Sequence, residues 1–122
     1  MMEKVQLSSD GKYIHVLSSG PASVAEMEKT LSQIAMLSSE SGIRKVLVDS
    51  RARTGRLTME DLYKGGVMLS EKLGPLFSIA VLVMESMPEQ DFFEDVALNR
   101  GINIAYFQQM DSALDWLQDG SS

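Results

Sequence analysis

The chain has 122 residues, of which 44% are hydrophobic and 23% charged, values that fit one ordinary globular domain. It contains no cysteine and one histidine, which excludes disulfide scaffolds, thiolate metal sites and zinc sites built on several imidazoles. No apolar run is long enough to span a bilayer, and the N-terminal residues lack a secretory signal pattern. We therefore expect a cytoplasmic protein without a membrane span.

The formal net charge of −6 is unevenly distributed along the chain. Residues 73–122 contain eight acidic residues and one basic residue, whereas five of the eleven lysines and arginines fall within residues 44–56. The overall negative charge argues against binding to nucleic acid, because phosphates would repel the protein. The cationic stretch predicts a local positive potential on an otherwise acidic molecule.

Strand and helix patterns alternate along the chain. In order they predict strands over residues 4–8 and 12–18, a helix between Ser23 and Gly42, a strand over 43–49, a helix between Thr58 and Gly74, a strand over 76–84, a helix between Ser86 and Gly101, a strand over 102–107 and a helix from Asp111. The order ββαβαβαβα, with about five strands and four helices, predicts an α/β fold. A β-hairpin would lead into a mostly parallel sheet with right-handed crossovers.

Four segments carry a resemblance to a known family. They are KVLVDSRARTGRL as strand and loop, EKLG at a helix end, the strand SIAVLVM, and the ending IAYFQQMDSALDWL. In this order the chain resembles the SpoIIAA-like family, relatives of the STAS domains that are also compared with the SEC14 lipid-binding fold. The resemblance implies one SpoIIAA-like domain over residues 1–122 and a non-enzymatic binding or regulatory role through protein–protein interaction.

Residues 50–57 are expected to form a loop at the carboxyl end of a parallel strand, where open α/β sheets usually bind ligands. Guanidinium groups bind phosphate or carboxylate, and the N-terminus of the following helix offers unpaired N–H groups. The alternative is a solvated loop whose arginines pair with acidic neighbours. The ligand-binding or anion-binding candidates are Ser50, Arg51, Arg53, Arg56 and Thr58.

Thr58 has two interpretations. The STAS regulators that the chain resembles are controlled by phosphorylation of a serine in an Asp-Ser-Ser-Gly motif after this strand. Aligned from Asp49, that serine falls on Thr58, although Leu57 and Met59 depart from the motif. Thr58 is thus a phosphorylation candidate or a plain helix N-cap.

Many SpoIIAA-like relatives also have a tryptophan where this chain has Arg56. A cation therefore replaces an aromatic side chain that would form a wall for a ligand.

Two adjacent glycines, Gly65 and Gly66, fall inside the predicted helix. Each costs about 1 kcal/mol relative to alanine in a helix interior, so a close approach of a sheet or of a partner is expected there. We therefore take Gly65 and Gly66 as interface candidates for a protein partner or a homodimer. The predicted buried stripe of this helix consists of Met59, Leu62, Gly66, Leu69 and Leu73.

No catalytic set can be assembled from the sequence. Asp49 ends a strand without a placed acid, base or metal ligand beside it, and we expect it to make structural hydrogen bonds. His15 alternates with Tyr13 and Leu17 on a strand and is expected to be structural. We expect no enzyme activity, no catalytic residue, no cofactor and no metal site.

Two functional hypotheses remain open. The first is a module that docks a protein partner or a homodimer mate. The second is a carrier or sensor of a small apolar or anionic ligand, such as a SEC14-like lipid or a phosphate-bearing molecule. The nine methionines suit either an adaptable apolar pocket or the filling of an ordinary core.

Overall fold

The computed structural model describes residues 2–55, 57–85 and 87–118. Its elements confirm the predicted order and the α/β class. They are β1 (Met2–Leu7), β2 (Ile14–Pro21), α1 (Val24–Ser41), β3 (Lys45–Thr54), α2 (Met59–Lys72), β4 (Ser78–Leu82), α3 (Pro88–Asn99), β5 (Asn103–Phe107) and α4 (Met110–Gln118).

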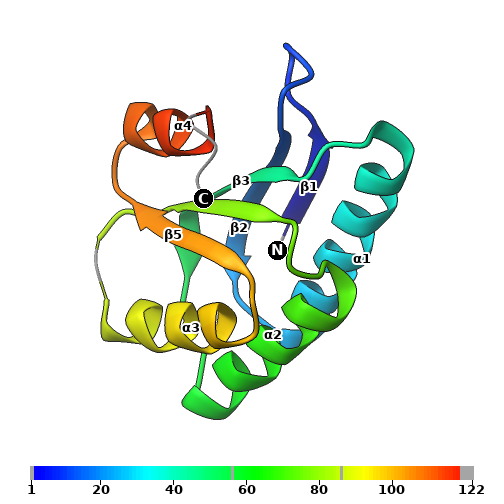
Figure 1. Ribbon diagram of the computed structural model, residues 1–122. Coiled ribbons are helices and arrows are strands. Elements are labelled where there is room, and N and C mark those ends of the chain that lie inside the picture. The colour runs from blue at the N-terminus through cyan, green and yellow to red at the C-terminus, as the bar shows by residue number, and fades with distance from the viewer. Residues whose placement is uncertain (1, 56, 86, 119–122) are drawn as a thin grey trace.

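The five strands form a sheet in the order β1-β2-β3-β4-β5. β1 and β2 are antiparallel and joined as a hairpin, and the remaining neighbours are parallel. Each crossover moves one strand further in the same direction, so right-handed connections place their helices on the same face. Figure 1 shows α1, α2 and α3 on this face and α4 on the opposite one. β3 is therefore sandwiched between two helical layers.

The core is divided by the sheet. The larger cluster lies between the sheet and α1, α2 and α3, and includes Val46 and Ile79. The smaller cluster lies under α4, where Ala113 and Leu117 pack on Leu47 and neighbouring residues. Val46 and Leu47 are adjacent in β3 and both fully buried, so the prediction of a strand covered on both faces is confirmed.

Local capping signals determine where two of the helices begin. The Ser23 hydroxyl accepts a hydrogen bond from the Glu26 amide at 3.1 Å, and the Thr58 hydroxyl accepts one from the Asp61 amide at 3.0 Å. α1 ends as predicted at Gly42, whose φ of 79° is in the left-handed region. These caps explain why the predicted starts of α1 and α2 agree with the structure.

The start of α3 differs from the prediction by about one residue. Its N-cap is Met87, whose amide donates to the Gln90 side-chain oxygen at 3.2 Å. Ser86, the predicted cap, lies outside the described residues. Pro88 at the first helical position favours this start, because its fixed φ suits the helix and its missing N–H would be unpaired there.

β3 is longer than predicted: residues 50–54 of the expected loop over residues 50–57 belong to the strand. The strand continues to Thr54 and stays paired with β2. Leu17 pairs with Asp49 but Ser19 pairs with Ala52, so β3 has one extra residue at this point. Such a β-bulge interrupts the alternation of side chains between the two faces of the sheet. The bulge therefore determines on which face of the sheet Arg51 and Arg53 lie.

Gly65 and Gly66 are buried inside the chain, which corrects their expected role as a partner interface. A β-carbon on Gly65 would meet the Met27 sulfur of α1 at 2.5 Å and Phe93 of α3 at 3.2 Å. A β-carbon on Gly66 would overlap Val96 of α3. The close approach inferred from the sequence is real, but it joins α2 to two helices of the same chain.

We expect Gly66→Ala to lower the free energy of unfolding by about 1 kcal/mol or more, because overpacking against Val96 outweighs the helix propensity of alanine. Urea denaturation followed by circular dichroism measures the change. The cost should shrink in a Val96→Ala background, and Lys64→Ala at an exposed position of α2 should stay within about 0.5 kcal/mol. An unchanged or higher stability of Gly66→Ala would contradict this packing role.

Candidate functional site

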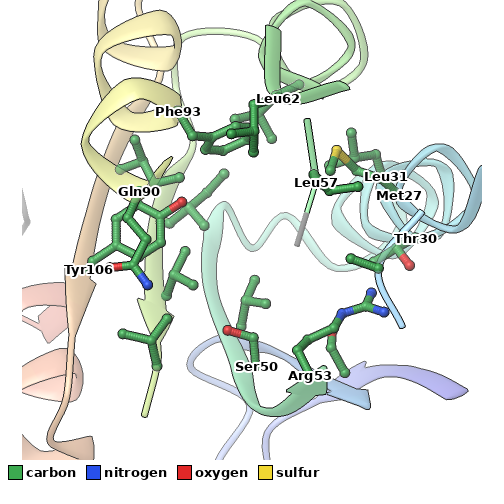
Figure 2. A pocket seen from close by; sticks show the side chains of 18 of the residues that line it. Met27, Thr30, Leu31, Ser50, Arg53, Leu57, Leu62, Gln90, Phe93 and Tyr106 are labelled. Atoms are coloured by element: carbon green, nitrogen blue, oxygen red, sulfur yellow. The ribbon is translucent and has the colours of Figure 1, made fainter. Parts of the chain in front are cut away.

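A cavity of about 310 Å³ lies between the sheet and the layer formed by α1, α2 and α3. It runs along β3, β4 and β5 and reaches their carboxyl ends, where such sheets usually bind ligands. Most of its lining is aliphatic or aromatic, and Figure 2 shows Met27, Leu31, Leu57, Leu62 and Phe93 around the space. The size is at the low end of the range for small-molecule sites.

The packing of α2 explains where this cavity is closed. Met27 and Phe93 lie against Gly65 and also line the cavity, so the close contact of three helices forms its wall. Leu57 and Leu62 line it from the start of α2 and the segment before it. The cavity therefore depends on residues from elements that are far apart in the sequence.

Tyr106 provides a polar group within this apolar space. Its side chain comes from β5 and is partly buried, and Figure 2 shows it on the side opposite Arg53 and Thr30. Across the three described ranges, no group makes a hydrogen bond with its hydroxyl. Burial raises the pKa of the Tyr106 hydroxyl well above its ordinary value, and the charge of Glu94 acts in the same direction. The phenol is therefore a neutral donor at physiological pH.

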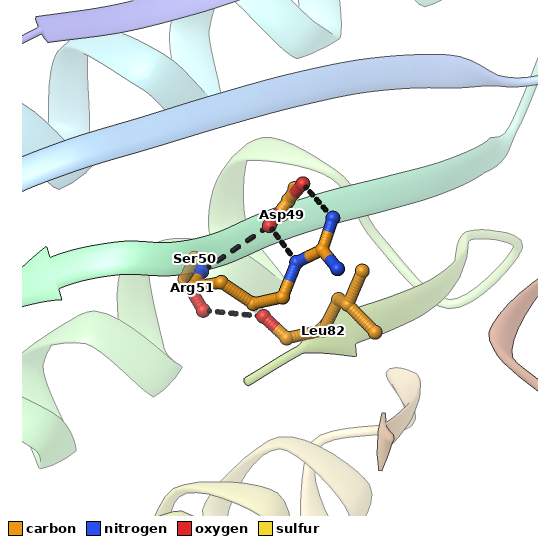
Figure 3. A network of polar contacts seen from close by, with 4 residues as sticks. All are labelled: Asp49, Ser50, Arg51 and Leu82. Carbon is orange, nitrogen blue, oxygen red and sulfur yellow. Dashed lines mark hydrogen bonds and ion pairs between the residues drawn. The ribbon is translucent and has the colours of Figure 1, made fainter. Parts of the chain in front are cut away.

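Ser50 and Arg53 also line the cavity, both from β3. The Ser50 hydroxyl donates to the Leu82 carbonyl at 3.0 Å, which ties the middle of β3 to the end of β4 (Figure 3). Arg53 is partly buried, and its Nη1 donates to the Pro21 carbonyl at 3.0 Å. This bond anchors the guanidinium at the rim of the cavity.

Arg51 lies on the opposite face of the sheet. Its guanidinium donates to both carboxylate oxygens of Asp49, at 3.0 and 2.8 Å, as drawn in Figure 3. The Arg51 amide also donates to this carboxylate at 3.2 Å, so the expected structural hydrogen bonding of Asp49 is confirmed. The hydrogen bonds from Arg51 hold the pKa of the Asp49 carboxyl below its usual value, against the opposing effect of burial.

Two of the three arginines in the predicted cluster, Arg51 and Arg53, are thus not brought together. Arg51 pairs with Asp49 away from the cavity and Arg53 lines it, because the β-bulge separates their faces. Arg56 lies outside the described residues. Of the five predicted ligand-binding candidates, Ser50 and Arg53 are at the cavity.

Thr58 is the N-cap of α2, which confirms one of its two interpretations. Its hydroxyl is engaged with the Asp61 amide, and Glu60 and Asp61 place two carboxylates in the first turn. These charges would repel a phosphate group on Thr58, whereas the helix N-terminus would attract it. Phosphorylation of Thr58 stays a prediction.

Sequence reasoning missed most of the polar and aromatic lining residues, among them Thr30, Gln90 and Tyr106. Tyr106 could have been found, because it shares a strand face with the buried Ile104 at a spacing of two. Thr30 and Gln90 lie on separate helices, and no local pattern indicates that they face one space. Gln90 also caps α3 and donates to the Glu85 carbonyl at 3.0 Å.

His15 lies away from this cavity. Its ring packs edge-on against Tyr13, with the ring centroids 6.1 Å apart. Its Nε2 atom is buried and has no hydrogen-bond partner among the residues described.

Within residues 2–55, 57–85 and 87–118, no group of three or more His, Cys, Asp or Glu residues is arranged to hold a metal ion. None of the helices described there has the length and hydropathy to cross a membrane.

Comparison with solved structures places this architecture among known folds. The chain is similar to an uncharacterised protein of the DUF3478 family with a SpoIIAA-like fold, from Shewanella loihica PV-4. The two are 21% identical, with a TM-score of 0.58, and the match covers 95% of this chain and 92% of the other. No family model and no curated protein matches the sequence. The chain has a SpoIIAA-like fold, as its resemblance implied.

We expect Arg51→Ala to raise the pKa of Asp49, because burial then acts without the opposing hydrogen bonds. Carboxyl carbon NMR titration measures this pKa directly. In the wild type the pKa is lower in the folded than in the unfolded state, so the pair stabilises the fold above about pH 3.9. That contribution is lost as the pH falls through the folded-state pKa.

The matched control is Arg53→Ala, two residues along the same strand but on the cavity face. It should leave the titration of Asp49 unchanged. An equal shift in both variants would mean that Asp49 responds to the overall charge of the strand and not to its bonds with Arg51.

Proposed function

We propose that the chain is a non-enzymatic binding module whose cavity takes a small, mainly apolar ligand that carries a polar group. The observation that carries this proposal is the cavity of about 310 Å³ with the Tyr106 hydroxyl in its lining. Tyr106 lines the cavity, and a phenol hydroxyl can both donate and accept a hydrogen bond, so it offers a ligand one polar contact among apolar walls. A ligand with one acceptor group and an apolar body would satisfy both the hydroxyl and the walls.

The volume limits the size of this ligand. At about 30 Å³ for each water-sized group, 310 Å³ holds on the order of ten non-hydrogen atoms. Each methylene group buried against the aliphatic walls contributes about 0.8 kcal/mol. A ligand of eight to ten atoms could therefore bind through apolar contacts, while its polar group sets its orientation.

A second candidate function is association through the sheet face that α4 leaves uncovered. α4 packs on β3, β4 and β5, whereas Leu17 of β2 is 40% exposed beside Lys4 and Arg51. A large apolar side chain that is exposed on a sheet, next to the ion pair of Arg51 with Asp49, suits contact with a second copy of this chain. This candidate retains the expected regulatory role through protein–protein interaction, as a homodimer.

We expect octan-1-ol, a neutral probe, to shift the backbone amide NMR signals of cavity residues such as Val48, Val81 and Tyr106. Val81→Phe fills part of the cavity, and the loss of room for about two methylene groups should weaken binding about tenfold. Leu17→Phe adds the same ring on the opposite face and should leave the affinity unchanged. Shifts scattered over the surface, or equal effects of both variants, would overturn the cavity proposal.

For the second candidate, sedimentation velocity measures the mass of the protein in solution. We expect a concentration-dependent dimer that Leu17→Lys converts to monomer, because two buried cations would face each other across the contact. Leu76→Lys, at a residue that is 71% exposed elsewhere, is the matched control and should keep the dimer. A wild-type protein that stays monomeric at all concentrations rejects this candidate.

A further inference from the structure

We infer that the ligand of the cavity is uncharged and that its hydroxyl or carbonyl oxygen accepts a hydrogen bond from the Tyr106 hydroxyl. This inference rests on the proposed function, since it names the class of ligand and its orientation in the same cavity. The Tyr106 side chain lines the space from β5. Because no group in the described part of the chain bonds its hydroxyl, that hydroxyl can serve a ligand.

The Tyr106 hydroxyl keeps its proton at physiological pH. Burial raises its pKa, and the negative charge of Glu94 on α3 acts in the same direction. A phenol that keeps its proton can donate to a ligand, and hydroxyl and carbonyl oxygens are neutral acceptors. An apolar space weakens a hydrogen bond less than water does. This single bond can therefore set which end of the ligand faces β5.

An anionic head group is disfavoured on the Tyr106 side of the cavity. The charge that acts on Tyr106 is the negative charge of Glu94. Asp91 and Asp95 are close to Glu94 on the same helix, and their charges add to the effect of burial in raising its pKa. An anion beside Tyr106 would be repelled by these carboxylates and would exchange water for aliphatic walls.

A cationic head group is disfavoured for a different reason. Among the lining residues that the structure describes, none is acidic, and Arg53 is the single charged side chain. An ammonium group would lose its hydration without gaining a carboxylate to pair with. Arg53 is not an unmatched cation either, because its Nη1 donates to the Pro21 carbonyl at 3.0 Å and Arg53 makes a further interaction within the chain. A neutral head group avoids both costs.

The arrangement of the lining sets the orientation of the ligand. Figure 2 shows Tyr106 and Gln90 on one side of the space and Met27 and Leu31 on the other. With its oxygen at Tyr106, a ligand extends its apolar chain toward α1. Gln90 adds no charge, and its amide already caps α3 and donates to the Glu85 carbonyl. A capacity on the order of ten non-hydrogen atoms admits a chain of eight carbons with one oxygen.

Four probes with eight carbons test the charge of the head group: octan-1-ol, octan-2-one, octanoate and octylamine. In an NMR titration of the ¹⁵N-labelled full chain at pH 7, we expect the two neutral probes to shift the amide signals of Val81 and Tyr106. Octanoate and octylamine should bind at least tenfold more weakly, because each buries an unpaired charge. The tighter neutral probe identifies the head group as an alcohol or a ketone. Equal or tighter binding of either charged probe overturns the inference.

Tyr106→Phe tests the hydrogen bond, because it removes the hydroxyl and keeps the ring. It should weaken octan-1-ol about fivefold and leave the binding of toluene, an apolar probe, unchanged. Tyr13→Phe is the matched control, since Tyr13 packs against the cluster under α4, and it should leave octan-1-ol unchanged. An equal loss for octan-1-ol and toluene, or equal effects of the two variants, would reject the hydrogen bond and with it the inference.

The outcomes separate this inference from the proposed function. If the probes shift the cavity residues regardless of their charge, the neutral head group is rejected and the apolar binding site stands. If no probe shifts these residues, both the inference and the proposed function fail. Should Tyr106→Phe not fold, nuclear Overhauser effects on the wild type replace it. Contacts from the C1 protons of octan-1-ol to the Tyr106 ring, with its terminal methyl at Met27, support the inference, and the reverse orientation overturns it.

Discussion

One extra residue in β3 determines how this side of the molecule is arranged. Leu17 pairs with Asp49 and Ser19 with Ala52, so the side chains beyond this point change faces. The change places Arg53 with Val48 and Ser50 on the cavity face, and leaves Arg51 beside Asp49 on the other. A regular strand would have concentrated both arginines on one face and left the cavity without a charge. The bulge thus places two nearby arginines in different surroundings: Arg53 lines the cavity and Arg51 forms an ion pair on the opposite face.

The second constraint is the close packing of α2 between α1 and α3. Gly65 and Gly66 weaken the helix by about 1 kcal/mol each, yet they allow Met27, Phe93 and Val96 to lie against its backbone. Packing recovers this loss only where the helices meet closely. Toward the carboxyl ends of the strands the same helices enclose a space instead of filling it. Tight contact at the glycines and open space beside them are therefore two parts of one arrangement.

The sequence predicted what local patterns encode, and little of what arises from contacts between distant segments. Element order, the caps at Ser23 and Thr58 and the helix end at Gly42 depend on neighbouring residues, and all agree with the structure. The end of β3 was placed five residues early, because polar residues after Asp49 resemble a loop although β2 pairs with them. Met59 was predicted to be buried but is 54% exposed, since it starts α2 before the helix reaches the core.

Among the residues that line the cavity, Ser50 and Arg53 were predicted as ligand-binding candidates, but they were expected in a loop and lie in β3. The cavity joins residues from α1, β3, α3 and β5, and no period within one element reveals that they surround one space.

The cavity also bears on stability. Voids left in apolar cores cost about 24 cal/mol per Å³, so a dry, closed space of 310 Å³ would cost on the order of 7 kcal/mol. Such a cost would be a large part of the 5 to 15 kcal/mol that stabilises a typical domain. Solvent at the rim around Arg53 reduces it, and a ligand that fills the apolar part recovers more by mass action on the folded state. Because the cavity is open to solvent, the fold avoids much of that cost, and the proposed ligand would add stability by filling the apolar part.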